Sequence, residues 1–119
     1  MAFDLNAYLL DPQNLKEEFK LAQTSEHYFR QVRPITCASG LTFSAQASVT
    51  HYCTPRDSVG PWEEVEIGYP SKRVEEFMEY ADNSDEPTDT VYAYVPVSVV
   101  EAVVNSHGGI VEPCLNDSE

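Results

Sequence analysis

The amino-acid sequence predicts an α+β fold, in which helices pack on one face of a single antiparallel sheet of four to five strands. Apolar residues recur at helical spacing in the first third of the chain and alternate with polar residues in the second third, and a strand followed by a helix is then predicted twice. With 119 residues, the chain corresponds to one domain, 1–119. We expect a mainly helical segment at 1–33, the sheet with two helices at 34–112 and a tail at 113–119.

The N-terminal segment contains a helix start signal. In Asp11-Pro12, the aspartate side chain can accept a hydrogen bond from a free backbone amide, and the proline fills a first-turn position that needs no donor. A helix is therefore predicted from about Pro12 to Gln23, preceded by a short helix over Leu5 to Leu10. The segment from His27 to Val32 can continue as helix or begin a strand, and the sequence leaves both open.

A two-residue period begins at Pro34. Pro34 to Cys37 predicts a short strand, residues 38–40 predict a turn, and Leu41 to Cys53 predicts a long return strand. The alternate residues of this long strand, His51 and Cys53 among them, are expected to face the core. If the strand lay at an edge of the sheet, it could pair with a second copy of the chain in a dimer.

The second half of the chain predicts two more strands and two more helices. The expected elements are a strand from Glu63 to Tyr69, a helix starting at Ser71, an acidic loop at 82–89, a strand from Thr90 to Val95, a helix from Val97 to His107 with a Gly108-Gly109 cap, and an edge strand at Ile110-Val111. In the fourth strand, the alternation predicts that Val91, Ala93 and Val95 face the core and that Tyr92 and Tyr94 lie opposite them.

The charge of the chain is distributed unevenly. The formal net charge is −13; residues 1–56 are neutral overall, whereas residues 57–119 hold fifteen acids against only Lys72 and Arg73. Nucleic acids and anionic membranes are bound through clustered Lys and Arg, so we expect neither direct nucleic-acid binding nor membrane binding. The expected partner is a basic protein or nucleoprotein complex.

The densest acidic segment is the preferred candidate site. Ten acids and two aromatic residues make up the predicted partner-binding surface: Trp62, Glu63, Glu64, Glu66, Glu75, Glu76, Glu79, Tyr80, Asp82, Asp85, Glu86 and Asp89. Further exposed aromatic contacts are expected among Tyr69, Tyr92 and Tyr94. Such a surface can imitate a phosphate backbone or fill a basic groove, with the acids raising the association rate and the aromatic rings supplying affinity. The alternative is an ordinary solvated surface.

A metal site is the alternative functional prediction. Cys37, His51 and Cys53 are zinc-ligand types that the predicted strands bring to one face, which describes a small zinc-stabilised structural or regulatory module. His107 or Cys114 would have to complete the tetrahedral ligand set. Paired zinc motifs such as C-x-x-C are missing from the sequence, so burial of these side chains as core residues is the preferred interpretation.

An enzymatic interpretation rests on the same region. His51 could activate Cys53 as a nucleophile, and Asp57 could orient the histidine, but this requires the three side chains to meet in space. The twenty acids contain no pair that spacing singles out for acid-base chemistry, and no phosphate-binding glycine loop occurs. We therefore expect a protein that is not an enzyme, with no catalytic residue and no cofactor.

The cellular location is predicted from the cysteines and the amino terminus. Three cysteines cannot all pair within one chain, and the N-terminal residues contain neither a basic start nor a long apolar run. Both observations favour reduced thiols and a cytoplasmic protein.

In its overall character the chain resembles the small acidic proteins that phages encode, in particular the anti-CRISPR and anti-restriction inhibitors. The resemblance rests on the size, the charge of −13 and the strand, helix, acidic loop, strand and helix from Glu63 to His107. The stretches Thr50 to Asp57 and Tyr92 to Val97 also resemble uncharacterised phage proteins. The resemblance implies an inhibitor that occupies the nucleic-acid-binding surface of a defence complex in the cytoplasm of a bacterial host, with DNA mimicry as one mode of action. It assigns no functional residue.

Overall fold

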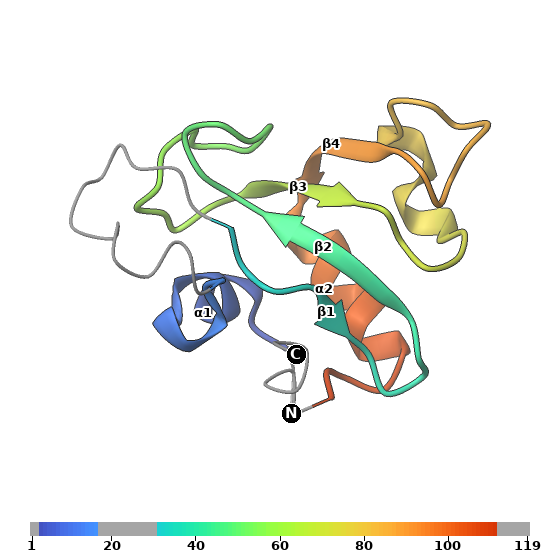
Figure 1. Ribbon diagram of the computed structural model, residues 1–119, viewed down its shortest axis with the longest axis horizontal. Helices are drawn as coiled ribbons and strands as arrows, with labels where there is room; N and C mark the ends of the chain where they lie inside the picture. Colours follow the sequence, from blue (N-terminus) through green and yellow to red (C-terminus); the bar gives the residue numbers. More distant parts are fainter. Residues whose placement is uncertain (1–2, 17–30, 112–119) are drawn as a thin grey trace.

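The computed structural model describes residues 3–16 and 31–111 and confirms the α+β fold. The helices and strands, with η marking 3-10 helices, are α1 (Leu5–Leu10), η1 (Pro12–Asn14), β1 (Ile35–Thr36), β2 (Thr42–Gln46), β3 (Glu64–Gly68), η3 (Glu75–Tyr80), β4 (Val91–Pro96) and α2 (Val97–Ser106). The four strands form one antiparallel sheet in the order β1-β2-β3-β4 (Figure 1). None of the helices in the two described ranges has the length and hydrophobicity of a membrane span.

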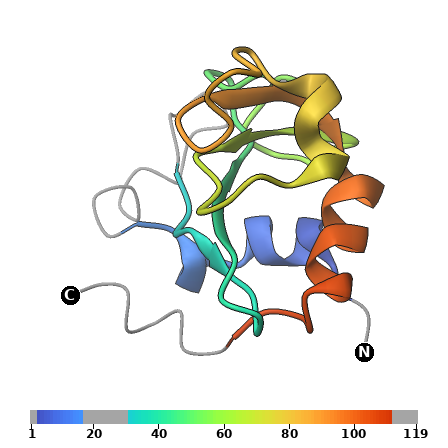
Figure 2. The same ribbon diagram turned by 90° about the vertical axis from the view of Figure 1, so that its right-hand side faces the viewer.

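The two α-helices lie close to each other, with α2 along one face of the sheet and α1 beside it (Figures 1 and 2). The Phe3 amide donates to Asn105 Oδ1 (3.1 Å), and the Leu5 amide donates to Glu101 Oε2 (3.0 Å). Both acceptors belong to α2, so these bonds fix the start of α1 to the middle and the C-terminal end of α2. The structure also confirms the prediction of a separate short helix over Leu5 to Leu10, which is α1.

An aromatic cluster forms the part of the core that holds η3 against the sheet. The ring centroid of Phe77 lies 5.5 Å from that of Phe43 in β2 and 5.9 Å from that of Tyr92 in β4. All three side chains are buried. Rings at these separations pack favourably and together bury a large apolar area, so η3 is anchored through Phe77.

The helix predicted after α1 is shorter in the structure. Asp11 caps its first turn, as predicted, by accepting a hydrogen bond from an amide two residues later. η1 nevertheless ends within one turn, because the buried Leu15 forms an antiparallel bridge with Val32, which is also buried. The prediction of a helix over Pro12 to Gln23 is therefore wrong at Leu15. The rest of that helix, and most of the segment 27–32, lie outside the described residues.

β2 is shorter than the predicted strand from Leu41 to Cys53. It pairs with β3 as far as Gln46, opposite Glu66, and the chain then turns, with the His51 amide donating to the Ser48 carbonyl (3.2 Å). β2 also lies between β1 and β3 rather than at an edge. The condition for pairing this strand with a second copy, a position at a sheet edge, is therefore not met.

Both edges of the sheet carry isolated bridges to other parts of the chain. Cys37, which follows β1, bridges Ile110, so the predicted edge strand at Ile110-Val111 is reduced to a single bridge. On the other side, Ala81 bridges Tyr92 of β4. These contacts restrict the addition of a further strand at either position.

The two helices predicted in the second half differ in outcome. η3 replaces the helix expected to start at Ser71, because the Ser71 hydroxyl accepts a hydrogen bond from the Thr42 amide (3.0 Å) instead of capping a helix. α2 agrees with the prediction. Its glycine cap is confirmed by the Gly109 amide, which donates to the Val104 carbonyl (2.9 Å).

β4 contains a β-bulge that changes the predicted facing of its side chains. Ala93 and Tyr94 together stand opposite the single β3 residue Glu66. The extra residue turns Tyr92 into the core, where it is fully buried, although the alternation predicts that it lies opposite the core-facing residues. Val91 and Ala93, predicted to face the core, are only partly buried. A bulge shifts the two-residue period by one, which explains the reversal.

Candidate functional site

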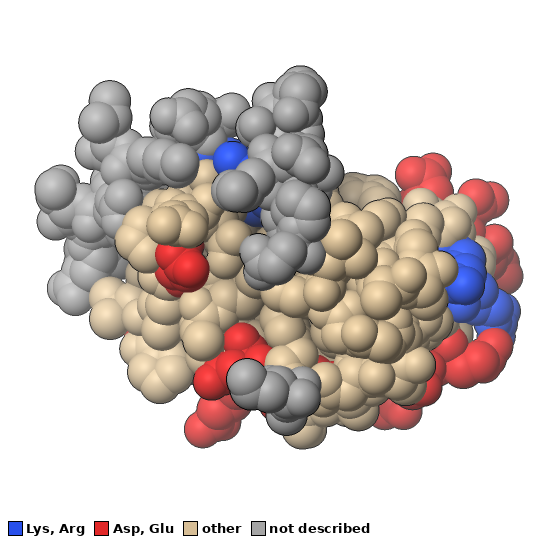
Figure 3. All heavy atoms as spheres, turned by 90° about the horizontal axis from the view of Figure 1, so that it is seen from below, with Lys and Arg blue, Asp and Glu red and all other residues tan. Residues whose placement is uncertain are grey.

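Seven of the ten predicted acids lie at one end of the molecule, formed by η3 and the loop 82–89, which has no helix or strand, as predicted. Their side chains are all exposed, and we call them the acidic end: Glu75, Glu76, Glu79, Asp82, Asp85, Glu86 and Asp89. Figure 3 shows carboxylates gathered at this end beside Lys and Arg side chains. The loop is tied to β4, because the Asp82 amide donates to the Val91 carbonyl (2.9 Å) and the Asn83 amide to Thr90 Oγ1 (3.0 Å).

The acidic end keeps most of its negative charge. Residues 72–89 hold seven acids against Lys72 and Arg73, a net charge of −5. Arg73 Nε lies 2.5 Å from Glu75 Oε2, and this contact lowers the pKa of Glu75. Both side chains are well exposed, so the ion pair contributes little stability. The two neighbouring bases therefore offset only part of the charge, and the acidic end stays strongly negative.

The three acids of the β3 region are more constrained. Glu63 is exposed, whereas Glu64 and Glu66 are partly buried. Glu64 Oε1 accepts a hydrogen bond from the Thr54 hydroxyl (2.9 Å), and Glu66 Oε1 accepts one from the Tyr52 amide (3.0 Å). Both carboxylates are thus held in place by the segment that follows β2.

Tyr80 connects the β3 acids with the acidic end. Partial burial raises the pKa of Tyr80, and the nearby carboxylates of Glu79 and Glu64 raise it further. Glu79 belongs to η3 and Glu64 to β3, so the tyrosine lies within electrostatic range of both groups. Since the side chain is partly buried, Tyr80 offers a smaller contact area than the predicted exposed anchor.

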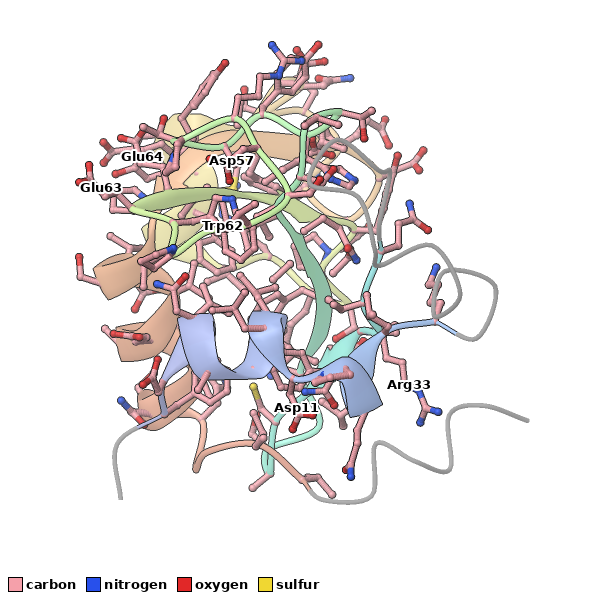
Figure 4. All side chains as sticks on the ribbon, turned by 90° about the vertical axis from the view of Figure 1, so that its left-hand side faces the viewer. Asp11, Arg33, Asp57, Trp62, Glu63 and Glu64 are labelled. Carbon is pink, nitrogen blue, oxygen red and sulfur yellow. The ribbon has the colours of Figure 1, made fainter. Side chains whose placement is uncertain are left out.

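Trp62 does not belong to the surface that the sequence predicts. The indole is only 2% exposed, and its Nε1 donates to the Asp57 carbonyl (3.0 Å). In Figure 4, Trp62 lies between α1 and β3, whereas Glu63 and Glu64 lie at the start of β3. The prediction of Trp62 as a partner-binding residue is therefore wrong, because its ring contributes to the core and its N–H already has an acceptor.

Within residues 3–16 and 31–111, the exposed aromatic side chains are tyrosines. Tyr69 is 58% exposed, Tyr52 is 46% exposed and Tyr94 is 40% exposed. The rings of Tyr52 and Tyr94 lie 6.0 Å apart at 45°, and the Tyr94 amide donates to the Tyr52 carbonyl (3.1 Å). Arg56 Cζ lies 5.3 Å from the Tyr52 ring centroid. We call Tyr52 and Tyr94 the tyrosine pair.

The sequence contains only part of the signal for the tyrosine pair. Alternation in the predicted strands already places both tyrosines opposite the core-facing residues. Their meeting depends on the bulge in β4 and on the turn after β2, neither of which has a distinctive local motif here. Tyr52 is therefore the residue of this surface that the prediction missed.

The Cys-His region is buried and has structural hydrogen bonds. Ser48 Oγ lies 2.6 Å from His51 Nδ1, and the Cys53 thiol donates to the Ser48 carbonyl (3.3 Å). Burial raises the pKa of Cys53, which is the opposite of the shift that activates a nucleophile. Asp57 Oδ1 accepts hydrogen bonds from the amides of Val59 and Gly60 (3.0 and 2.9 Å), so Asp57 stabilises a turn.

The residues of the predicted zinc site are not brought together. Cys37 follows β1 at the end where the hairpin to β2 turns, whereas His51 and Cys53 follow the opposite end of β2. In the part of the chain that the structure describes, no three His, Cys, Asp or Glu side chains form a group suited to a metal ion. His107 Nδ1 lies 2.7 Å from Ser39 Oγ, and Cys114 lies outside the described residues.

The candidate functional site therefore consists of the acidic end, the carboxylates of β3 and the tyrosine pair. Hydrogen bonds connect the tyrosine pair to Glu66, and Tyr80 lies within electrostatic range of β3 and η3 carboxylates. Searches of protein-family models, curated proteins and solved structures find no match to this chain.

Proposed function

We propose that this protein is a non-enzymatic binding protein whose acidic end contacts a basic, nucleic-acid-binding surface of another protein. The observation that carries the proposal is the gathering of seven exposed carboxylates on η3 and the following loop, where residues 72–89 contain two bases, Lys72 and Arg73. Nearby like charges repel one another and lower stability, which favours a binding role over mere solubility.

The same charge distribution supports a competitor of nucleic acid. A protein groove that binds nucleic acid presents Lys and Arg at spacings suited to phosphates, and carboxylates fixed on a folded surface can occupy those positions. The resemblance in character to anti-CRISPR and anti-restriction proteins extends the proposal to a phage-encoded inhibitor of a bacterial defence complex.

The test compares two variants with the same net charge. Glu75→Gln, Glu76→Gln and Glu79→Gln together remove three charges from the acidic end. Ala7→Lys, Leu10→Lys and Gln13→Lys together change the net charge equally, at exposed positions of α1 and η1. Folding of both variants is checked by circular dichroism.

The probe is a fluorescent peptide of about nine arginines, titrated at about 50 mM and about 200 mM salt. We expect the wild type to bind the peptide, with affinity that falls steeply as salt rises. The glutamine variant should bind several-fold more weakly, and the lysine variant should stay closer to the wild type. Equal losses in both variants would show that only net charge matters and would contradict a localised acidic site.

The defence-complex part of the proposal has its own measurement. Expression of the wild-type protein in bacteria with an active restriction or CRISPR system should raise the plating efficiency of a targeted phage. The triple glutamine variant should lose this effect, whereas the lysine variant should retain it. If the wild-type protein did not change the plating efficiency of phages that these systems target, this part of the proposal would be contradicted. The peptide result would be unaffected.

A further inference from the structure

The tyrosine pair has features of an anchor for a cationic side chain. The bulge in β4 sets Tyr94 opposite Glu66, and the backbone of Tyr52 is held by the carboxylate of Glu66 and by the amide of Tyr94. Two large rings and a carboxylate therefore share one place on the sheet surface. Both rings keep more than a third of their surface exposed.

The Tyr52 ring already contacts a guanidinium group. Arg56 Cζ lies 5.3 Å from the ring centroid, within the range of a cation–π interaction. Arg56 itself is exposed, so this contact forms at the surface. One face of the Tyr52 ring thus already accepts a guanidinium, and a partner's guanidinium at this face has to take the place of Arg56.

The neighbouring carboxylates are oriented before any partner arrives. One oxygen of Glu64 is held by the Thr54 hydroxyl, and one oxygen of Glu66 is held by the Tyr52 amide. Both of these bonds use Oε1 of the carboxylate. A carboxylate that is already fixed loses less side-chain entropy when it accepts a further hydrogen bond.

We infer that the tyrosine pair, with the carboxylates of Glu64 and Glu66, is the anchor for an arginine side chain of the basic partner. The inference rests on the proposed function, because the acidic end would supply the long-range attraction. Arginine fits better than lysine, since its planar guanidinium can stack on a tyrosine ring and donate to a carboxylate at the same time. The anchor would therefore give chemical selectivity to a surface that is otherwise merely negative.

The test measures selectivity between two peptides of equal charge, about nine arginines or about nine lysines long. Tyr52→Leu and Tyr94→Gly remove one ring each, and Tyr69→Gly is the matched control. Tyr69 is an exposed tyrosine with a positive φ of 51°, as Tyr94 is with a φ of 56°, but it lies outside the pair. Tyr94→Phe keeps the ring and checks whether the hydroxyl matters.

We expect the wild type, Tyr94→Phe and Tyr69→Gly to prefer the arginine peptide. Removal of either ring should weaken arginine-peptide binding by about fivefold and leave lysine-peptide binding nearly unchanged. Thermal unfolding of each variant confirms that it is folded.

The failure of the anchor and the failure of the proposed function give different results. If both peptides bind equally well to the wild type with strong salt dependence, or if the preference survives loss of either ring, the anchor is wrong and the acidic site stands. If neither peptide binds, both proposals fall.

Discussion

The side chain of Asn6 in α1 holds the backbone of Trp62 by two hydrogen bonds. Asn6 Nδ2 donates to the Trp62 carbonyl (2.9 Å), and Asn6 Oδ1 accepts from the Trp62 amide (2.7 Å). The amide side chain thus takes the place of a neighbouring strand at the point where the chain enters β3. Gln46 makes the same two contacts with the backbone of Val32 (2.9 and 2.8 Å).

Replacement of Asn6 should therefore destabilise the fold. Asn6→Ala leaves an amide and a carbonyl without their partners, and we expect the free energy of unfolding to fall by about 1–3 kcal/mol. Urea denaturation measures the change, with the exposed Gln13→Ala as the control, for which we expect a change within about 0.5 kcal/mol. A loss for Asn6→Ala no larger than that of the control would mean that water replaces both bonds at no cost.

Gly60 and Gly40 provide a matched pair for testing the packing of Trp62. Both have positive φ, 68° and 99°, but a Cβ at Gly60 would lie 2.8 Å from a Trp62 ring carbon, whereas a Cβ at Gly40 would meet nothing within 4 Å. Gly40→Ala should cost about 1–2 kcal/mol from backbone strain alone. Gly60→Ala should cost about 1–3 kcal/mol more, because the ring must also move. Equal losses of unfolding free energy would show that the ring shifts freely.

Tyr94 should tolerate glycine better than alanine. Its φ of 56° lies in the left-handed region, which glycine enters without steric cost. Both substitutions remove the ring, so their difference isolates the backbone, and we expect Tyr94→Gly to exceed Tyr94→Ala in unfolding free energy by about 1 kcal/mol. Ala93→Gly, at the adjacent position without positive φ, should instead lose about 0.5–1 kcal/mol. If Tyr94→Ala had a higher unfolding free energy than Tyr94→Gly, the result would contradict this backbone conformation.

Alkaline pH should destabilise the fold through its buried groups. Burial raises the pKa of the Cys37 and Cys53 thiols above their ordinary value of 9.0 and that of Tyr92 above 10.0. The folded state therefore holds these protons more tightly than the unfolded chain does. Their contribution is complete below pH 9.0 and is lost as the pH rises through the folded-state pKa values.

Urea unfolding across this range measures the loss. The unfolding free energy of the wild type should fall as the pH rises above 9.0, and Cys53→Ala should show a shallower fall. A flat profile for the wild type would mean that the thiols remain accessible to solvent in the folded state.

Hydrophobic periodicity predicted the order of the strands and helices along the chain. It predicted which side chains are buried better than it predicted which residues pair between strands. His51 and Cys53 are buried, as their alternation predicts, yet they lie beyond the end of β2. A two-residue period reports which side chains avoid water, and an irregular turn can satisfy it as well as a strand can. The length of β2 was therefore overestimated although its core residues were identified.

The exposed surface was predicted less well, because it depends on contacts between residues that are far apart in the sequence. Trp62 is buried because Asn6, 56 residues away, binds its backbone and because the Asp57 carbonyl accepts its indole N–H. The inward turn of Tyr92 depends on a single extra residue in β4. Local patterns contain neither relationship, whereas the acids of the loop 82–89 were predicted to be exposed because no apolar residue accompanies them.

The bulge in β4 also links the packing of the interior to the exposed surface. One inserted residue places the ring of Tyr92 inside the protein and the ring of Tyr94 outside it. A strand of the same sequence without the bulge would place both rings on one face, so that either Tyr92 would leave the interior or Tyr94 would enter it. Selection for a new contact at position 94 therefore cannot alter the strand register without rebuilding the interior, so variation on this face is confined to side-chain replacement.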